Sequence, residues 1–475
     1  MKHFLKLSLV ATSLFWLAGC SPSPQNPTGS AQPITPSFVP NNQIQVISGG
    51  VPVAQAKILI GMGNQGRDFL MTDENGLVTI PAYWTNAEHV TIEANGFIRA
   101  TYLNQMPTAK AFTVHLADIK PTIEVKGNTT QFQPYIVEKD GIVDFALVLP
   151  LVSTEDMLFF NENSVLSTEM DYISIFGQRM GIPSNISVPV QKEKYGLFTF
   201  TLNKPLFRFK VARPGNMKLL AARGRASLGA LKDRLPPNEL INQITIAGGG
   251  VRATTVASTG GQVDIPVNEL NFNQKLAVTA PQLPQGTHLL AVPLIADGAL
   301  RYPSDVKSLK PMESRQLTVA AQGASELATI ISPLDRTVSK AASAALVPVR
   351  PASQALKHLG LPAAPTVANN QIQLSSPTIP AGVMATGLYM TKSAVTLTTV
   401  EGETIETIER KWEVYGEKWD TAVTLPVLPE THEGKSRWEA SFLARDQGVR
   451  PQKTDDARSN LFNQLNYVSR NSVDL

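Results

Sequence analysis

Short stretches that alternate apolar and polar residues recur along most of the chain, with turn-forming residues between them. In the first such region, Asn75-Gly76 and Asn95-Gly96 separate stretches that have the period of a half-buried strand. Dipeptides of this kind supply the positive φ angles that tight turns need. We therefore predict a small antiparallel β-sandwich over residues 43–118, with strands at 44–47, 56–60, 77–81, 90–94 and 112–116.

The same alternation continues through the middle of the chain and predicts two further β-domains, at 119–235 and 236–335. Residues 336–368 are rich in Ala, Ser and Pro, which favours an interdomain linker, with a loosely held strand as the alternative. A last β-sandwich domain is predicted at 369–475, with strands at 396–400, 411–415, 422–426 and 437–442.

Four segments within these domains have weaker patterns. We expect 180–185 to be a loop and 221–231 to be a short helix weakened by two glycines. Residues 197–202 and 206–211 flank Asn203-Lys204-Pro205 and predict a hairpin. The polar end, 450–475, is expected to fray or to dock as an extended arm. The predicted fold class is thus all-β, with several Ig-like or related antiparallel β-sandwich domains in a row after a disordered tether.

The N-terminus decides where these domains are located. Lys2 and Lys6 precede an apolar stretch that ends in Leu17-Ala18-Gly19-Cys20, so residues 1–19 have the pattern of a secretory signal. The segment resembles the lipobox of bacterial lipoproteins, which implies that the Cys20 thiol carries lipid and anchors the chain to a membrane. An ordinary cleaved signal with an accidental cysteine is the alternative. Residues 20–42 are rich in Pro and Ser and uncharged, and we interpret them as the tether.

The first predicted sandwich also resembles a known family. Its phrases GVPVAQAKILIG, TDENGLVTIPA and VTIEANGFIRATY have the spacing of the carboxypeptidase-regulatory-like, transthyretin-like family of Ig-like domains. This resemblance covers about 75 residues and implies a non-catalytic accessory or spacer module. It transfers no catalytic residue to this chain.

Composition narrows the choice of partners. Removal of Lys2 and Lys6 with the signal lowers the formal charge from +3 to +1, which is too small an excess for nucleic-acid binding. Cys20 is the only cysteine, so no disulfide is expected within the chain. After residue 19 no apolar stretch is long enough to span a bilayer. We expect no cofactor, and membrane attachment through Cys20 alone.

Several short motifs suggest catalytic chemistry but lack its context. Ser304-Asp305-Val306-Lys307 matches S-x-x-K, yet S-D-N and K-T-G are absent, so a surface turn is favoured. Gly434-Lys435-Ser436 lacks the first glycine of a phosphate loop and favours a hairpin turn. The five histidines after the signal are scattered, and His115 and His288 are expected to be ordinary strand residues. The carboxylates Glu409, Glu413, Glu417 and Asp420 are close in sequence but are predicted to lie on a solvated face.

Aromatic residues are the remaining candidates for a ligand site. If exposed, Trp84, Trp412, Trp419 and Trp438 would form a stacking platform for sugars or a hot spot for protein binding. Trp412, Val414 and Trp438 occupy the apolar positions of their alternating strands, which favours places in the core instead.

Two functional hypotheses follow. The first is a lipid-anchored, non-catalytic protein of the bacterial cell envelope that binds a protein or glycan partner or acts as a spacer. Ser21 replaces the aspartate that marks inner-membrane retention in many lipoproteins, which indicates the outer membrane. The second is a secreted hydrolase of envelope polysaccharide or peptide, with an accessory N-terminal domain and a site within 119–335.

Overall fold

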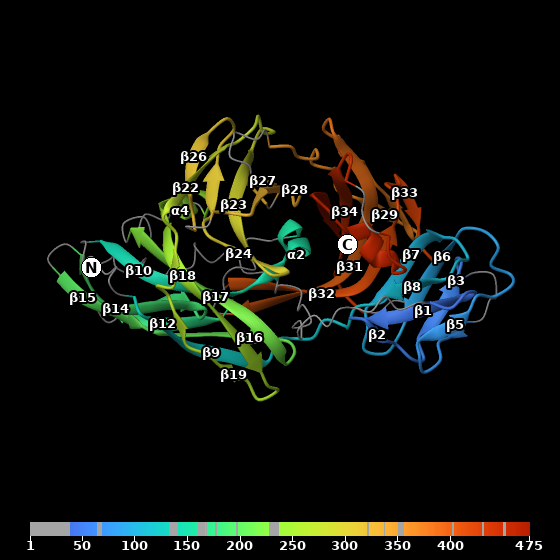
Figure 1. The fold of residues 1–475 in the computed structure, drawn as a ribbon, viewed down its shortest axis with the longest axis horizontal. Helices are drawn as coiled ribbons and strands as arrows, with labels where there is room; N and C mark the ends of the chain where they lie inside the picture. Colours follow the sequence, from blue (N-terminus) through green and yellow to red (C-terminus); the bar gives the residue numbers. More distant parts are fainter. Residues whose placement is uncertain are drawn as a thin grey trace. The chain divides into compact units, whose positions relative to one another are not determined.

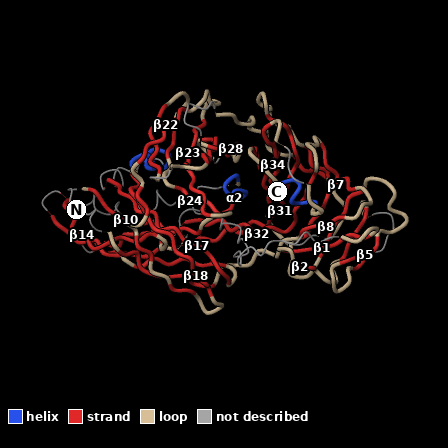
Figure 2. Tube along the Cα trace, in the orientation of Figure 1, coloured by secondary structure: helices blue, strands red, loops and turns tan. Residues whose placement is uncertain are grey.

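Strands form nearly all the regular structure, which confirms the all-β prediction (Figure 1 and Figure 2). The computed structural model describes residues 39–63, 69–132, 141–159, 167, 169–175, 178–195, 198–227, 237–320, 323–336, 338–349, 356–400, 403–429, 432–449 and 453–475. The predicted signal, Cys20 and most of the predicted tether lie outside these residues.

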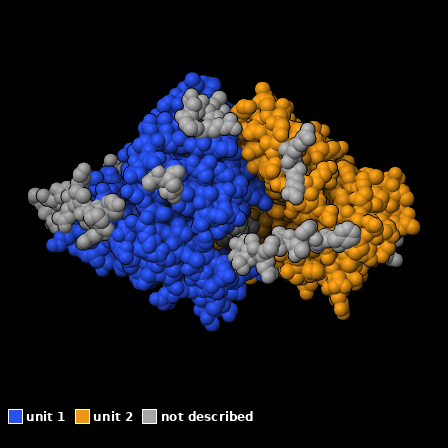
Figure 3. Space-filling model, in the orientation of Figure 1, with its two compact units in different colours: residues 1–30, 120–334, 346–356 blue, residues 31–119, 335–345, 357–475 orange. Residues whose placement is uncertain are grey.

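The chain divides into two compact units, coloured separately in Figure 3. Unit 1 comprises the described residues within 120–334 and 346–356, and unit 2 those within 39–119, 335–345 and 357–475. Residues 43–118 and the predicted last domain therefore both belong to unit 2, although more than 200 residues of unit 1 separate them in sequence.

The N-terminal module of unit 2, residues 39–118, is a two-sheet sandwich. In one sheet β1 lies between β2 and β5 and also pairs in parallel with β8. In the other, β4, β3, β6 and β7 are neighbours in that order. The strands within its described residues are β1 (Gln43–Ser48), β2 (Val51–Pro52), β3 (Lys57–Ile60), β4 (Leu70–Met71), β5 (Leu77–Thr79), β6 (Glu88–Glu93), β7 (Arg99–Gln105) and β8 (Lys110–Thr113).

The C-terminal strands of unit 2 continue the second sheet of this module. Their order is β28-β35-β34-β31-β32, where residues 342–345 of β28 belong to unit 2, and β32 pairs in parallel with β7. A small sheet, β29-β30-β33, packs its apolar side chains against this sheet around Trp412, Val414 and Trp438. The bounds are β28 (Ala342–Pro348), β29 (Thr366–Ala368), β30 (Gln371–Gln373), β31 (Val383–Val400), β32 (Glu403–Gly416), β33 (Ala422–Thr424), β34 (Ser436–Asp446), α5 (Ala457–Phe462) and β35 (Tyr467–Asp474).

Unit 1 is built around long antiparallel strands. Its largest sheet has the order β15-β14-β10-β17-β18-β21, and β9, β16, β19 and β20 form a second sheet whose side chains share a core with it. The bounds in this part are β9 (Ile123–Thr130), β10 (Ile142–Pro150), β11 (Val152–Ser153), α2 (Thr154–Leu158), β12 (Met170–Ile175), β13 (Gln178–Pro183), β14 (Ile186–Tyr195), β15 (Phe198–Lys204), β16 (Leu206–Val211), β17 (Gly215–Ser227) and α4 (Pro237–Gln243).

The remainder of unit 1 contains the sheet β11-β24-β23-β27 and the pair β22-β26. The bounds there are β18 (Thr245–Val256), β19 (Gly261–Gln262), β20 (Ile265–Pro266), β21 (Leu270–Asn271), β22 (Gln274–Thr279), β23 (Thr287–Asp297), β24 (Leu300–Pro303), β25 (Lys307–Leu309), β26 (Ser314–Val319) and β27 (Glu326–Pro333).

Three local predictions in unit 1 are wrong. Residues 221–227 of the predicted helix at 221–231 belong to strand β17, in which Leu219 to Ala222 are buried on both faces of the sheet, and residues 228–231 lie outside the described residues. The predicted loop at 180–185 contains the end of β13. The predicted hairpin does not form, because β15 pairs with β14 whereas β16 crosses to pair with β9.

Two predictions for unit 2 also differ from the structure. Part of the predicted linker forms β28, in which Ala342 to Val347 are buried and which pairs with β35. The C-terminal arm is not frayed: it contains α5, and β35 pairs with both β34 and β28. Small residues suit β28 because both of its faces are covered, so an Ala-rich composition did not indicate flexibility.

Candidate functional site

A cluster of ionisable side chains is buried in unit 2, between the N-terminal module and the C-terminal strands. We define the Glu413 cluster as Glu413, Arg410, Tyr415, Tyr389, His115 and Asp118. Glu413 is completely buried, whereas the His115 side chain is 30% exposed. A buried carboxylate requires compensating charges and hydrogen bonds, so its surroundings decide what this cluster can do.

Strand alternation places the cluster on one face of the sheet. Trp412 and Val414 of β32 point into the apolar core, so Glu413 and Tyr415 point to the opposite face. That face is covered by Phe462 of α5, which packs edge-on against Tyr415, and by His115, which contacts Glu413. His115 and Asp118 come from the end of the N-terminal module and reach Glu413 and Arg410 there.

Both carboxylate oxygens of Glu413 are fully engaged. Tyr389 Oη donates to Oε1 at 2.9 Å, and Arg410 Nη1 donates to the same atom at 3.0 Å. Tyr415 Oη donates to Oε2 at 2.8 Å, and His115 Nδ1 lies 2.7 Å from that oxygen. Burial alone would raise the pKa of Glu413, but His115 and the guanidinium groups of Arg410 and Arg458 hold it well below its usual range.

Arg410 links this carboxylate to a second one. Its Nη2 donates to Asp118 Oδ1 at 2.9 Å, and its backbone N–H donates to Oδ2 at 2.8 Å. Burial would lower the pKa of Arg410, yet Glu413 and its other anionic neighbours raise it well above the ordinary value. Arg410 therefore stays charged and bridges the N-terminal module to β32.

Aromatic rings enclose the cluster. Tyr415 stacks on Tyr102 and on Tyr389, with ring centroids 4.8 and 5.3 Å away. Phe462 of α5 packs edge-on against Tyr389 at 5.5 Å. Burial and the Glu413 charge raise the pKa values of Tyr389 and Tyr415 well above 10.0, so both phenols remain protonated donors. With every Glu413 oxygen occupied, the geometry fits a clamp between two parts of the sheet.

The predicted aromatic platform is not exposed. Trp84, Trp412 and Trp438 are each less than a tenth exposed. Trp412 Nε1 donates to Thr101 Oγ1 of β7 at 2.9 Å, and the Arg99 guanidinium lies 4.9 Å from the Trp412 ring. Trp419 packs against the same core and donates from Nε1 to the Leu443 carbonyl. The core positions that parity favours for Trp412 and Trp438 are therefore confirmed.

The S-x-x-K segment in unit 1 is buried, so the prediction of a surface turn is wrong. Ser304 is completely buried, and its Oγ donates to the Thr318 carbonyl at 3.1 Å. Lys307 Nζ pairs with Asp305 at 3.3 Å and also donates to the Ile244 carbonyl. The hydroxyl and the ammonium thus satisfy separate backbone groups, and Ser304 is not set up as a nucleophile.

The other motifs have structural roles. Asp73 Oδ1 accepts from the N–H groups of Asn75 and Leu77 at 2.9 and 2.8 Å, which is turn chemistry. Gly434 has a φ of +92° in the turn that leads into β34, where a phosphate loop would need a helix. Within the described ranges, no three His, Cys, Asp or Glu side chains converge in a way that could hold a metal ion.

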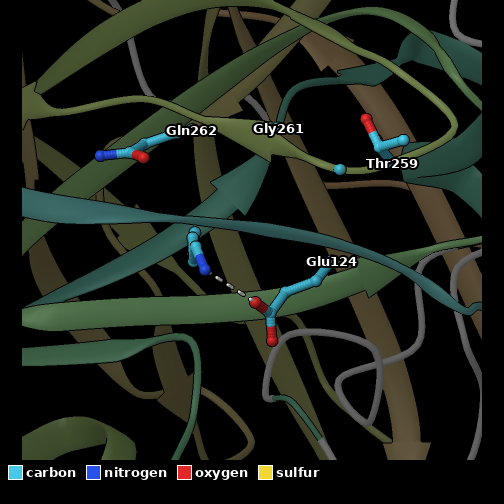
Figure 4. A pocket seen from close by; sticks show the side chains of 6 residues that line it. Glu124, Thr259, Gly261 and Gln262 are labelled. Atoms are coloured by element: carbon cyan, nitrogen blue, oxygen red, sulfur yellow. Dashed lines mark ion pairs between the residues drawn. The ribbon is translucent and has the colours of Figure 1, made fainter.

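A shallow polar depression on unit 1 is drawn in Figure 4. It lies beside the turn before β19, and Lys126 and Glu124 of β9 form an ion pair at 3.5 Å across it. The side chains of Lys126 and Glu124 are 52% and 38% exposed, so water screens their charges. Its lining residues are Glu124, Lys126, Thr259, Gly260, Gly261 and Gln262.

Glu413 and His115 were missed as partners by sequence reasoning. The prediction of a solvated face for Glu413 is wrong. Alternation along the strand correctly assigns Trp412 to the core and Glu413 to the opposite face, but the local sequence does not show which segment covers that opposite face. That cover comes from residues about 300 positions earlier in the chain. The available signal was the pair Glu413 and Tyr415 on one strand face, since tyrosine commonly donates to a buried carboxylate.

The comparisons with known proteins give little. Neither models of known protein families nor curated proteins match the chain. Among solved structures, the chain is similar to a crystal structure of a point mutant of Salmonella alpha-2-macroglobulin, at 10% identity and a TM-score of 0.11. The alignment covers 89% of this chain and 28% of that one. None of the helices in the described part of the chain is long and apolar enough to cross a membrane.

Proposed function

We propose that the chain is a lipid-anchored protein of the bacterial cell envelope with a non-catalytic binding or spacing role. In this proposal unit 2 is the base, held to the membrane through Cys20, and unit 1 is the part presented to a protein or glycan partner. The outer membrane is the proposed location, because Ser21 follows the lipid-bearing cysteine.

The path of the chain is the observation that carries this proposal. The described chain starts in unit 2 at Val39 and ends in β35 of the same unit. Unit 1 is inserted between these ends and is joined to unit 2 by more than one connection. An inserted unit with several connections is restrained more than one joined by a single linker, which suits presentation from an anchored base.

The Glu413 cluster supports the role of unit 2 as a rigid base. It ties the N-terminal module, which directly follows the proposed tether, to the strands that end the chain. The sandwich topology of residues 43–118 fits the proposed carboxypeptidase-regulatory-like module, a class used as an accessory or spacer. Residues 21–38, if extended, would let the base stand up to about 60 Å from the lipid.

Membrane fractionation tests the anchor. The full chain should sediment with membranes and resist a carbonate wash, whereas Cys20→Ala should leave the membrane fraction, because stable anchoring requires the acyl chains. Ser21→Asp is the matched variant, since it keeps the lipid and should move the protein to the inner membrane. Membrane retention of the Cys20→Ala protein would overturn the proposed anchor.

A second experiment tests the non-catalytic role. The mature chain with Cys20→Ser should retain an envelope protein or glycan on a column without altering its mass. Release of sugar, peptide or acyl products from isolated envelope material, lost on heat treatment of the protein, would contradict this role and favour the hydrolase alternative.

A further inference from the structure

One end of the N-terminal module is formed by segments without charged side chains. We define the rim as residues 39–42, 80–87 and 106–109, which include no Asp, Glu, Lys, Arg or His. Most of these residues are exposed, and the side chains of Tyr83 and Met106 are 45% and 51% exposed. Large apolar side chains that stay in water beside uncharged polar groups indicate a surface suited to contact with an apolar phase.

The directions of the strands bring the three segments of the rim together. β1 runs antiparallel to β5 and parallel to β8, so the start of β1, the end of β5 and the start of β8 lie at one end of the first sheet. In the second sheet, Glu88 at the start of β6 lies opposite Gln105 at the end of β7. The β5–β6 loop and the β7–β8 loop therefore lie at the end of the sandwich where the chain enters from the tether.

Hydrogen bonds of the main chain fix the shape of the rim. The Ile80 N–H donates to the Asn42 carbonyl at 3.0 Å, which ties the entering chain to the β5–β6 loop. Within that loop the Trp84 N–H donates to the Pro81 carbonyl at 3.0 Å, and the Trp84 side chain is buried. Tyr83 thus stays exposed on a loop that its neighbour Trp84 anchors in the module.

The other end of the module carries exposed charges. Asp73 and Glu74 lie there, in the exposed turn between β4 and β5. The charged residues that directly follow the rim segments, Glu88 and Lys110, are only partly exposed, and Lys110 Nζ donates to Gln105 Oε1 at 2.9 Å. Removal of a charged group from water is costly, so the rim is the end of the module that is suited to contact with lipid.

We propose that the rim rests on the surface of the membrane that holds the lipid on Cys20. This inference deepens the proposed function and rests on it, because the contact requires the anchor. The chain enters the module at Val39, inside the rim, and only residues 21–38 separate Val39 from Cys20. The rim is therefore the part of the module with the shortest connection to the lipid, and the base lies on the membrane instead of standing at the full reach of the tether.

The side chains of the rim suit the zone of the lipid headgroups. Tyrosine is enriched in that zone because its ring enters the apolar layer while its hydroxyl stays in water. Met106 adds apolar area, and Asn41 and Thr85 can form hydrogen bonds with the headgroups. Two large side chains bind a membrane weakly by themselves, so the contact depends on the tether, which keeps the rim at a high effective concentration beside the membrane.

A fluorescent label on the rim measures this contact. The full chain is purified from envelopes with its lipid and placed in vesicles of phosphatidylethanolamine and phosphatidylglycerol that contain a lipid with a nitroxide on its headgroup. Cys20 is the only cysteine and its thiol carries the lipid, so an added cysteine can be labelled alone. Thr85→Cys places the label on an exposed position of the rim and keeps both large apolar side chains. Asn95→Cys, in the exposed turn between β6 and β7, is the matched control at the other end.

We expect the nitroxide to quench the label at position 85 at least about threefold more than the label at position 95, because only the rim lies within reach of the headgroups. Met106→Asp should reduce the quenching at position 85 at least about twofold, since it places a charge against the lipid. Ala54→Asp, at an exposed position of the other end, should leave the quenching unchanged. Similar quenching at positions 85 and 95, or equal effects of Met106→Asp and Ala54→Asp, would overturn the proposal. Unchanged circular dichroism shows that each variant is folded.

Flotation of the vesicles distinguishes this result from failure of the anchor. If the chain did not float with the vesicles, the proposed anchor would be wrong, and the contact of the rim with it. If the chain floated and the label at position 85 were shielded only after soluble envelope proteins were added, the rim would bind a protein, and the proposed membrane contact alone would be wrong.

Discussion

Within each of the two units, separate parts of the fold meet, but the contacts between those parts differ in kind. In unit 1 the sheets share an apolar core, and at two glycines the backbones approach too closely to leave room for a side chain: a Cβ on Gly250 would lie 1.8 Å from the Pro266 carbonyl oxygen, and one on Gly127 1.7 Å from that of Val263. In unit 2, the N-terminal module and the C-terminal strands meet through large ionisable side chains around Glu413. Unit 1 should therefore be sensitive to added volume, and unit 2 to lost charge.

The tryptophans allow the two units to be followed separately. Apart from Trp16 in the predicted signal, all of them, namely Trp84, Trp412, Trp419 and Trp438, belong to unit 2. Tryptophan fluorescence during urea unfolding should report on unit 2, whereas far-UV circular dichroism reports on both units. Because fluorescence reports on unit 2 alone, a change in unit 1 can be distinguished from a change in unit 2.

The largest effect is expected from Glu413→Ala. It leaves Arg410, and the His115 ring, without the buried carboxylate that compensates them, and breaking a buried charge network of this kind costs about 3–5 kcal/mol. The tryptophan transition should move to lower urea by a corresponding amount. Glu409→Ala is the matched control, because Glu409 is 44% exposed and its loss should change the transition by less than about 0.5 kcal/mol. Equal shifts for the two variants would contradict a clamp at Glu413.

Gly250→Ala should have the next largest effect, in unit 1 alone. The added methyl collides with a backbone oxygen that cannot move without disturbing β20, and the expected cost is about 3 kcal/mol. The dichroism transition should shift while the tryptophan transition stays in place. In Gly181→Ala, the control, the nearest atom is 3.6 Å from the new methyl, so little change is expected. A shift of the tryptophan transition in Gly250→Ala would show that the units do not unfold separately.

Acid should weaken unit 2 in two steps. His358 donates from Nδ1 to the Ser343 carbonyl, and burial lowers its pKa to about 4 from 6.5. Between these values the unfolded chain binds a proton that the folded chain does not, so stability falls as pH drops from about 6.5 to 4, by up to about 3 kcal/mol. Glu413 has a lowered pKa, so its contribution is lost at still lower pH, below the ordinary carboxyl pKa of about 4.3.

Two variants assign these steps, through the urea midpoint of the tryptophan transition measured at several pH values. His358→Gln should reduce the dependence of this midpoint on pH between 6.5 and 4. Glu413→Gln should reduce its dependence on pH below 4.5. A profile that keeps its slope from 6.5 to 4 in His358→Gln would show that another group is responsible.

The smallest effect is expected from Thr101→Val. This change removes the acceptor of Trp412 Nε1 and the hydroxyl that pairs with Thr91 at 2.8 Å, and a lost hydrogen bond of this type costs about 1 kcal/mol. The tryptophan transition should shift slightly, with a change in emission maximum from Trp412. Thr113→Val is a useful comparison, since its hydroxyl bonds to Asp456 instead of to the β7–β32 junction. An unchanged emission maximum in Thr101→Val would indicate that the indole bond does not persist in solution.

Alternation along the chain was enough to predict the fold class and the strands with one buried face, among them β1, β32 and β34. Trp412, Val414 and Trp438 were placed in the core by parity, because one buried face leaves a period of two in the sequence. Residues 221–227 were predicted to be helical because a strand that is covered on both faces has no alternation of apolar and polar residues. Its Leu-rich and Ala-rich sequence then resembles that of a helix. The exchange of partners by β15 and β16 depends on contacts far apart in sequence, which local patterns do not encode.

The Glu413 cluster could be predicted only in part. The chemistry of each residue was visible, but the meeting of His115 with Glu413 depends on β7 pairing with β32 across more than 300 residues. Glu413 was predicted to be solvated because it lies on the face of its strand opposite to the core. That assumption is correct for sheets in which this second face is open to water. The burial of Ser304 and Lys307 was hidden for the same reason, since their partners lie on β26 and beside α4.

Hydrogen exchange tests the central claim, that the N-terminal module and the C-terminal strands of unit 2 form one base closed by Glu413. We predict that amides of β7 and β32 open together with the same free energy, and that Glu413→Gln accelerates both while leaving β17 of unit 1 unchanged. If β7 kept its protection in this variant while β32 lost it, the two parts would be independent domains and the account of a joined base would be wrong.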